Sequence, residues 1–212
     1  MVGKILRIII QAPIKLSMIG MRRGPHIWRY YMYKHLSEVF DSVVIEKDSK
    51  VLAISGSERL CKVMGFNEEQ LTIADYPEYN ILDLNFPDES FDFIISDQVL
   101  EHIDGNPQLA IDESLRVLKP GGIAVHTTCF IQQIHWGPED LWRFSPSALK
   151  YLCQGFGEII DCSGWGNRFI WPYIWLGLRF QGIPEASWHP INKLATYNEK
   201  VWPAVTWIVA RK

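Results

Sequence analysis

A short segment in the second half of the chain carries several side chains that can do chemistry. His135, in "IHWGPEDLWRFSPSAL", has an ordinary pKa near neutrality and can remove a proton from a hydroxyl group as a general base. Asp140 and Arg143 can hold a sugar, or they can pair with each other. Trp136 and Trp142 can stack on a sugar ring, or they can belong to the core. These residue types make His135 a candidate general base and the segment a candidate ligand-binding region.

Other polar residues stand where apolar runs end. Apolar runs over 49–55, 70–75, 91–96 and 123–130 are expected to be strands. Helical patterns cover 25–40, 57–65, 106–122 and 145–157, and further strands are expected at 158–163 and at 205–212. Strands alternating with helices predict a mostly parallel α/β sheet with helices on both faces, which binds ligands beyond the carboxyl ends of its strands. The polar residues at those ends are Ser55–Ser57, Asp75, Ser96–Gln98 and Thr127–Phe130.

The composition is that of a globular protein. Of 212 residues, 21 are basic and 24 are acidic, so the net charge of −3 does not favour nucleic acid as a partner. The four cysteines form no C-x-x-C pair, which argues against a zinc site and favours core thiols in the reducing cytoplasm. The length predicts a single domain over 1–212, with an N-terminal helical cap at 1–45 and a substrate-side insertion with an aromatic cap at 130–200.

Two apolar segments raise the question of membrane contact. The N-terminal segment "MVGKILRIIIQAPIKLS" lacks the features of a signal peptide, and no run of apolar residues is long enough to span a membrane. The aromatic segment "FIWPYIWLGL" (169–178) is expected to be a buried cap or a patch that touches a membrane surface. Peripheral membrane contact is left open, and the sequence does not indicate an oligomeric state.

Two blocks in series resemble class I S-adenosylmethionine-dependent methyltransferases of the methyltransferase type 11 kind. They read "ILDLNFPDESFDFIISDQVLEHI" and "AIDESLRVLKPGGIAVHTT". The resemblance implies a Rossmann-like sheet of seven strands, or of six if the segment around 79–84 is irregular. Only four residues separate Asp75 from Asn80, so the usual crossover helix is missing and the crossover is shortened. The matching residues are Asp83, Phe86, Asp88, Ser90–Asp92, Val99–Ile103, Glu113 and Arg116–Gly122.

The same resemblance implies S-adenosyl-L-methionine as cofactor and assigns residues to it. Asp75 is expected on the ribose hydroxyls, and Asp83 with Leu84 on the adenine, although both acids can also be solvated strand-end residues. Ser55, Gly56 and Ser57 are expected around the methionine part, but "VLAISGSE" keeps only one glycine where the family has two and has Ala53 in place of an acid. The remaining expected cofactor contacts are Ser96, Asp97, Arg29 and Tyr30.

The segment around His135 is similar to one in methyltransferases that act on cell-surface glycans. The resemblance therefore implies O-methylation of a sugar or a related small molecule, with His135 or His102 as the base. Glu101 and His102 could instead serve a divalent ion as in other methyltransferases, but Gln98 stands where a further carboxylate is wanted, so no metal is expected. The alternative function is a catalytically inactive binding or scaffold protein with a degraded cofactor loop. A nucleotide-dependent oxidoreductase is disfavoured because no G-x-G-x-x-G follows a strand.

Overall fold

The structure is a computed structural model that describes residues 2–135, 137 and 139–212, and it divides into two compact units. The first unit comprises the described residues up to Met32 together with Trp165–Trp202. The second unit comprises Tyr33–Gly164 and Pro203–Lys212. The expected organisation, a single domain with caps at 1–45 and 130–200, stays a prediction.

The second unit is built on the α/β sheet that the sequence predicted. Its six strands lie in the order β3-β2-β4-β5-β8-β6. Strands β3, β2, β4 and β5 run parallel, and β8 joins β5 in the antiparallel direction. The strands are β2 (Val51–Ile54), β3 (Leu71–Ala74), β4 (Phe91–Asp97), β5 (Leu118–Cys129), β6 (Glu158–Trp165) and β8 (Val205–Arg211).

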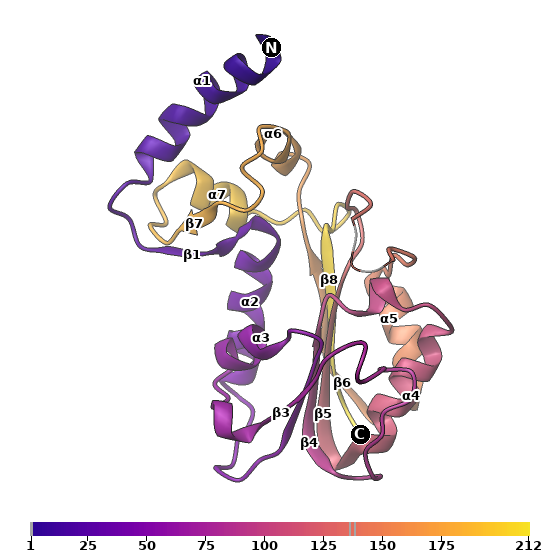
Figure 1. The fold of residues 1–212 in the computed structure, drawn as a ribbon. Helices are drawn as coiled ribbons and strands as arrows, with labels where there is room; N and C mark the ends of the chain where they lie inside the picture. Colours follow the sequence, from indigo (N-terminus) through magenta and orange to yellow (C-terminus); the bar gives the residue numbers. More distant parts are fainter. Residues whose placement is uncertain (1, 136, 138) are drawn as a thin grey trace. The chain divides into compact units, whose positions relative to one another are not determined.

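Side chains alternate across this sheet, so each strand contributes to two apolar layers. On one face Phe93 of β4 packs against the rings of Phe40 and Phe66, next to α2 and α3. On the other face Ile94 belongs to a cluster with Ile111 of α4 and Leu149 of α5. Figure 1 shows α4 and α5 together on that side of the sheet. The helices of this unit are α3 (Glu58–Val63), α4 (Pro107–Val117) and α5 (Pro146–Leu152), with short 3₁₀ turns at η1 (Glu68–Gln70), η2 (Leu100–His102) and η3 (Cys153–Gly155).

The crossover between β3 and β4 contains no helix, as its length predicted. In residues 75–90 the backbone forms turns and one isolated bridge between Asn80 and Asp83. This segment does not add a strand beside β3. As a result β3 forms one edge of the six-stranded sheet.

The helix expected over 106–122 is shorter than predicted. It ends at Val117, because Leu118 already pairs with Phe91 as the first residue of β5. Gly121 has φ of +79°, a conformation that glycine adopts with little strain. At Gly122 a side chain would bring its Cβ to 2.9 Å from the backbone oxygen of Asp92, which is too close. The two glycines of the Pro-Gly-Gly run are therefore needed near the start of β5, and they do not mark the end of the helix.

The first unit is mainly helical. A short antiparallel pair joins β1 (Arg23–His26) to β7 (Gly182–Pro184). The helix α1 lies within the helical cap expected at 1–45, although its bounds were not predicted, and it exposes several apolar side chains, among them Ile8 and Leu16. Among the described residues, no helix has both the length and the apolar character needed to cross a membrane. The helices are α1 (Val2–Ser17), α2 (Ile27–Phe40, whose residues from Tyr33 onward belong to the second unit), α6 (Ile170–Trp175) and α7 (Pro190–Thr196).

The aromatic segment around 169–178 is divided between interior and surface. Ile170, Tyr173 and Ile174 are buried, whereas Phe169 and Trp175 are 56% and 65% exposed. One side of this segment, which contains α6, is therefore buried, and the other side exposes aromatic rings. Whether that exposed face touches a membrane stays a prediction.

Candidate active site

Two hollows lie at opposite ends of the parallel strands. The larger, of about 1450 Å³, lies at their amino ends and is lined by Lys50, Leu71 and Phe91. The smaller, of about 860 Å³, lies at the carboxyl ends, where Ser55, Gly56 and Asp75 meet Gln98 and His102. Because parallel α/β sheets bind ligands beyond the carboxyl ends of their strands, the smaller cleft is the candidate site.

The loop after β2 reaches this cleft through backbone groups. Ser55 and Gly56 have φ of +46° and +78°, so the chain turns sharply out of the strand. A Cβ built on Gly56 would meet no other atom within 4 Å, so the backbone at this position borders open space. The loop therefore keeps a left-handed turn although it has a serine at the first of the two positions.

Asp75 lies next to this turn at the cleft and holds it in place. Its Oδ1 accepts a hydrogen bond from the backbone N–H of Gly56 at 3.0 Å, and the hydroxyl oxygen of Ser55 accepts one from the N–H of Tyr76 at 3.3 Å. The carboxylate of Asp75 is exposed at the cleft. A carboxylate in this place can accept hydrogen bonds from two neighbouring hydroxyl groups of a ribose.

Three further predicted residues lie beneath the cleft in a buried network. The Ser57 hydroxyl accepts the N–H of Asp97 at 2.8 Å, and Asp97 accepts hydrogen bonds from Tyr33 and, at 2.6 Å, from Thr127. Ser96 pairs with His126 at 2.8 Å. Burial lowers the pKa of His126 to about 4, so this imidazole is neutral near neutral pH. Contact of Ser57, Ser96 or Asp97 with a cofactor stays a prediction.

The predicted adenine residues lie apart from the cleft lining, and their neighbours take that place. Asp83 is exposed, and Leu84 is buried with its N–H donating to Glu113 at 2.8 Å. Asn80 and Ile81 line the cleft instead, and sequence reasoning missed them because the short crossover offers no strand pattern to fix the register. Roles of Asp83 and Leu84 in cofactor binding stay predictions.

The shortened crossover is anchored to α4 by Arg116. Its guanidinium donates to the backbone oxygens of Phe86 and Leu84 at 2.8 Å and 2.7 Å, and it pairs with Glu113. The hydrogen bond from Arg116 lowers the pKa of the Glu113 carboxyl, although burial opposes that shift. Glu113 and Arg116, which belong to the segment that resembles the methyltransferases, therefore hold the crossover against α4.

Two histidines meet at the side of the cleft. The rings of His102 and His135 are 5.0 Å apart and nearly perpendicular, and Nδ1 of His102 is hydrogen-bonded to the backbone oxygen of Glu139. His102 lines the cleft, whereas His135 lies next to it on the loop after β5. The structure therefore brings the two candidate bases together, and which of them acts as a base stays a prediction.

Asp140 and Arg143 pair with each other, which was one of the two interpretations of the sequence. The guanidinium forms a two-point contact with the carboxylate, at 2.7 Å for the Nη2–Oδ2 pair. The hydrogen bond from Arg143 lowers the pKa of Asp140 to about 2, although burial opposes that shift. Trp142 stacks on Phe144 and donates its indole N–H to Ile103, whereas the predicted Trp136 lies outside the described residues.

Arg29 and Tyr30 belong to the first compact unit. The Tyr30 hydroxyl accepts a hydrogen bond from Asn192 at 2.8 Å, and burial raises its pKa. This contact gives Tyr30 a role within its own unit. Contact of Arg29 and Tyr30 with the cofactor stays a prediction.

The chain is similar to known proteins in both sequence and fold. Residues 35–126 match the family model described as a methyltransferase domain. A curated relative, a probable S-adenosylmethionine-dependent methyltransferase from Mycolicibacterium smegmatis, is 33% identical over 76 residues. That match covers 32% of this chain and 29% of the relative, so the chain spans under a third of the length of that protein.

Solved structures share the fold at low sequence identity. The [4+2]-cyclase SpnF superposes with a TM-score of 0.56 and 16% identity over 100% of this chain and 95% of its own. An S-adenosylmethionine-dependent methyltransferase from Archaeoglobus fulgidus gives a TM-score of 0.52 and 14% identity over 87% of this chain and 94% of its own. At such identities the likeness establishes the Rossmann-like fold alone, and it includes a protein named for a different reaction.

Proposed function

We propose that this chain, whose residues 35–126 belong to the S-adenosylmethionine-dependent methyltransferases, transfers a methyl group to an oxygen of a sugar or related small molecule. The match of residues 35–126 to the methyltransferase domain and the similarity to the curated relative support the family expected from the sequence, and the name of that relative supports the cofactor class. The acceptor and the atom that is methylated belong to the proposal.

The observation that carries the proposal is the cleft that joins Ser55, Gly56 and Asp75 to His102. Its volume of about 860 Å³ is in the range of small-molecule sites. Backbone at Gly56 that borders open space allows close approach of a ligand, and the exposed Asp75 carboxylate suits a ribose. These residues fit S-adenosyl-L-methionine, which supplies an electrophilic methyl group on a sulfonium when it is bound.

The contributions of this chain are binding, orientation and proton removal. The loop after β2 and Asp75 hold one reactant, and the region of His102 and His135 receives the other, so that much of the rate gain comes from positioning. One of these imidazoles takes the proton of the acceptor hydroxyl as its oxygen forms the new bond to carbon. The methyl group leaves sulfur in the same step, and S-adenosylhomocysteine is the second product.

Support for a glycan acceptor comes from the segment after β5. His135, Trp142 and the Asp140–Arg143 pair follow the carboxyl end of a central strand, where a substrate segment of this fold is expected. Because the carboxylate and guanidinium bind each other, we assign this pair to holding the loop in shape. Trp142, with 38% of its surface exposed, is the aromatic residue that we assign to stacking on a sugar.

The test is titration calorimetry of the folded chain with S-adenosylmethionine and S-adenosylhomocysteine. We expect binding that Asp75→Ala weakens about tenfold or more, since two charge-assisted hydrogen bonds are lost at roughly 1 kcal/mol each. Glu78→Ala is the matched control, because Glu78 is an exposed acid on the same crossover outside the cleft lining, and it should leave the affinity unchanged. Absence of heat up to high micromolar ligand contradicts the proposal.

A second candidate function is a binding protein without turnover. Ser55 favours it, since a non-glycine residue at φ +46° is strained in a loop that must approach a ligand closely. The two candidates differ in one observable. Cofactor binding without consumption of S-adenosylmethionine across a panel of sugar and nucleotide-sugar acceptors would favour the binding protein.

A further inference from the structure

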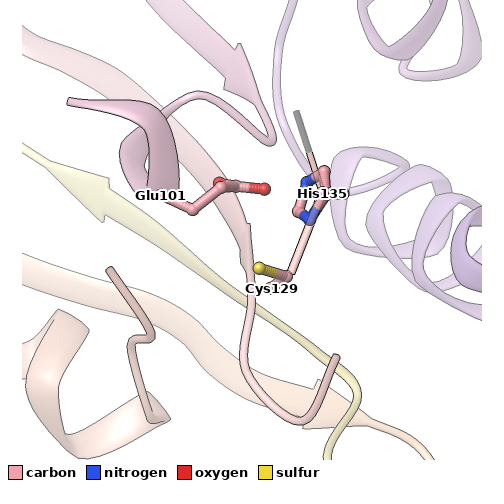
Figure 2. Close-up of side chains that lie close together, drawn as sticks. All are labelled: Glu101, Cys129 and His135. Carbon is pink, nitrogen blue, oxygen red and sulfur yellow. The ribbon is translucent and has the colours of Figure 1, made fainter. Parts of the chain in front are cut away.

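Three side chains that commonly bind metal ions meet beside the cleft. Glu101 comes from the turn η2, Cys129 ends β5, and His135 lies on the loop that follows (Figure 2). One ligand atom from each lies within 4.8 Å of the other two. The spacing of cysteines along the sequence gave no hint of such a site, because the three residues come from separate segments.

The distances are compatible with a bound ion after small rotations of the side chains. Ligand atoms at about 2.0–2.3 Å from a zinc ion lie roughly 3.3–3.8 Å from one another in a tetrahedral arrangement. Side-chain movement of about 1 Å closes the cluster to that size. All three residues belong to the second unit, and two of them are fixed by secondary structure.

The burial of the cluster favours a cation. Glu101 and Cys129 have no exposed surface, and the Glu101 carboxylate accepts a hydrogen bond from Thr128 at 2.9 Å. The free energy of placing a carboxylate in the interior is lowered when a positive charge lies next to it. The carboxylate also accepts the S–H of Cys129 and lies near the Arg143 guanidinium. A divalent cation would add positive charge there and would replace the thiol proton, since a metal binds cysteine as the thiolate.

Asp140 orients the third ligand. Its Oδ2 accepts the backbone N–H of His135 at 2.8 Å and lies 3.2 Å from Nδ1 of the same residue. A carboxylate behind a histidine is the usual arrangement around metal-bound imidazoles, since it fixes the ring and directs Nε2 to the metal. Both oxygens of Asp140 are already engaged by Arg143, which favours Glu101 over Asp140 as the carboxylate ligand.

We propose that Glu101, Cys129 and His135 form a binding site for a divalent transition-metal cation of the zinc type. A set of three protein ligands with mixed oxygen, sulfur and nitrogen donors leaves a fourth position for water or an oxygen ligand. The site adjoins His102, which lines the cleft, so an oxygen bound there is next to the proposed acceptor region. The metal site does not depend on the proposed methyl transfer, and when His135 binds the metal, His102 is the one of the two candidate imidazoles left to act as the base.

The experiment is cobalt substitution in the chain of 212 residues. The chain is stripped with a chelator, loaded with one equivalent of Co²⁺ and examined by absorption spectroscopy, with bound zinc measured by elemental analysis in a parallel sample. We expect stoichiometric metal, visible bands of four-coordinate cobalt and a near-ultraviolet band from thiolate-to-cobalt charge transfer. The charge-transfer band reports a cysteine ligand directly.

Variants identify the ligands. Cys129→Ser should abolish the charge-transfer band, whereas Cys162→Ser, a half-buried cysteine outside the cluster, should retain it. Glu101→Gln and His135→Gln should each weaken Zn²⁺ binding about tenfold or more, measured by competition with a chromogenic chelator. Circular dichroism of each variant separates loss of a ligand from loss of the fold.

Failure to retain Zn²⁺ or Co²⁺ in the folded native chain overturns the proposal, and so does a charge-transfer band that survives in Cys129→Ser. Both readouts are independent of activity. If S-adenosylhomocysteine binds while no metal does, the metal site alone is wrong. If metal binds while S-adenosylhomocysteine does not, the proposed methyltransferase function alone is wrong.

Discussion

At the scale of single residues, the loop after β2 shows how a turn survives the loss of a glycine. Ser55 and Gly56 both adopt positive φ. Two hydrogen bonds hold them there, one from the Gly56 N–H to the Asp75 carboxylate and one from the Tyr76 N–H to the Ser55 hydroxyl oxygen. The strain at Ser55, of order 1 kcal/mol, is offset by these contacts. The loop thus has the shape of a ligand-binding turn with only one glycine in it.

Gly56→Val should abolish binding of S-adenosylhomocysteine and leave the fold intact. The new side chain projects into space that is open in the structure, and a β-branched residue strains the backbone at φ +78° by about 1–2 kcal/mol. Calorimetry measures binding and denaturant unfolding measures stability.

The matched control for this variant is Gly121→Val. Gly121 has φ of +79° and is equally open, but it stands at the start of β5, at the other end of the sheet from the cleft. Its replacement should lower stability by a similar amount without affecting binding. Retained binding in Gly56→Val would mean that the cofactor lies elsewhere.

At the scale of elements, the loop between β5 and α5 is held by the pair of Asp140 and Arg143. The Asp140 side chain is only 2% exposed, and it also accepts the backbone N–H of His135. Since His135 lies within this loop, the pair determines where a candidate base stands.

Arg143→Leu should lower the free energy of unfolding by about 2 kcal/mol, because it leaves the Asp140 carboxylate buried without its guanidinium partner. Arg211→Leu is the control, since its pair with Glu158 is exposed on both sides and should contribute under about 1 kcal/mol. Urea unfolding at neutral pH measures both. Equal losses in the two variants would contradict the structural role of the Asp140–Arg143 pair.

Elements with a strong local pattern could be predicted from the sequence, and those defined by distant contacts could not. The run "FDFIIS" predicted β4 because both of its faces are apolar. The end of α4 was misplaced because the helical pattern continues to Leu118, whereas pairing with Phe91 decides the boundary. The bounds of α1 were not predicted within the helical cap expected at 1–45, because its apolar pattern was considered only as a targeting segment.

The candidate site shows the same division. Ser55, Gly56, Asp75 and His102 line one cleft as strand-end positions, which the alternation of strands and helices predicts. Asn80 and Ile81 were missed because an irregular segment has no register in its sequence. The cluster of Glu101, Cys129 and His135 depends on three separate segments, which local spacing cannot reveal.

At the scale of the whole molecule, stability depends on a buried histidine. His126 is fully buried between strands and pairs with Ser96, and among the described residues its Nε2 has no hydrogen-bond partner. Burial lowers its pKa in the folded state from 6.5 to about 4. Between pH 4 and pH 6.5 the His126 imidazole is therefore mostly protonated in the unfolded chain and mostly neutral in the folded chain.

The free energy of unfolding should consequently fall as the pH decreases from 6.5 towards 4, by on the order of 3 kcal/mol in total from this residue. His126→Asn keeps a hydrogen-bonding group near Ser96 but does not titrate. Urea unfolding at neutral pH and at about pH 5 should show a smaller acid loss in the variant. If the free energy of unfolding falls by the same amount on acidification in the variant and in the native chain, His126 is not the cause of the loss.

His35 provides a control of opposite sign. Its hydrogen bond with Asp161 raises its pKa in the folded state above 6.5, although burial opposes that shift. The stability it contributes is fully present below the unfolded pKa and is lost as the pH rises through the folded value. His35→Gln should therefore reduce stability more at low pH than at high pH.

The shortened crossover also bears on how the protein behaves at high concentration. Without a further strand, β3 presents unpaired backbone groups at the edge of the sheet, and its Ile73 is 40% exposed. Such an edge is a template for pairing with a second chain, and proteins limit that risk by keeping edge strands short and charged. With four residues, β3 has the first of these protections but lacks a charge, so aggregation during refolding should begin at this edge.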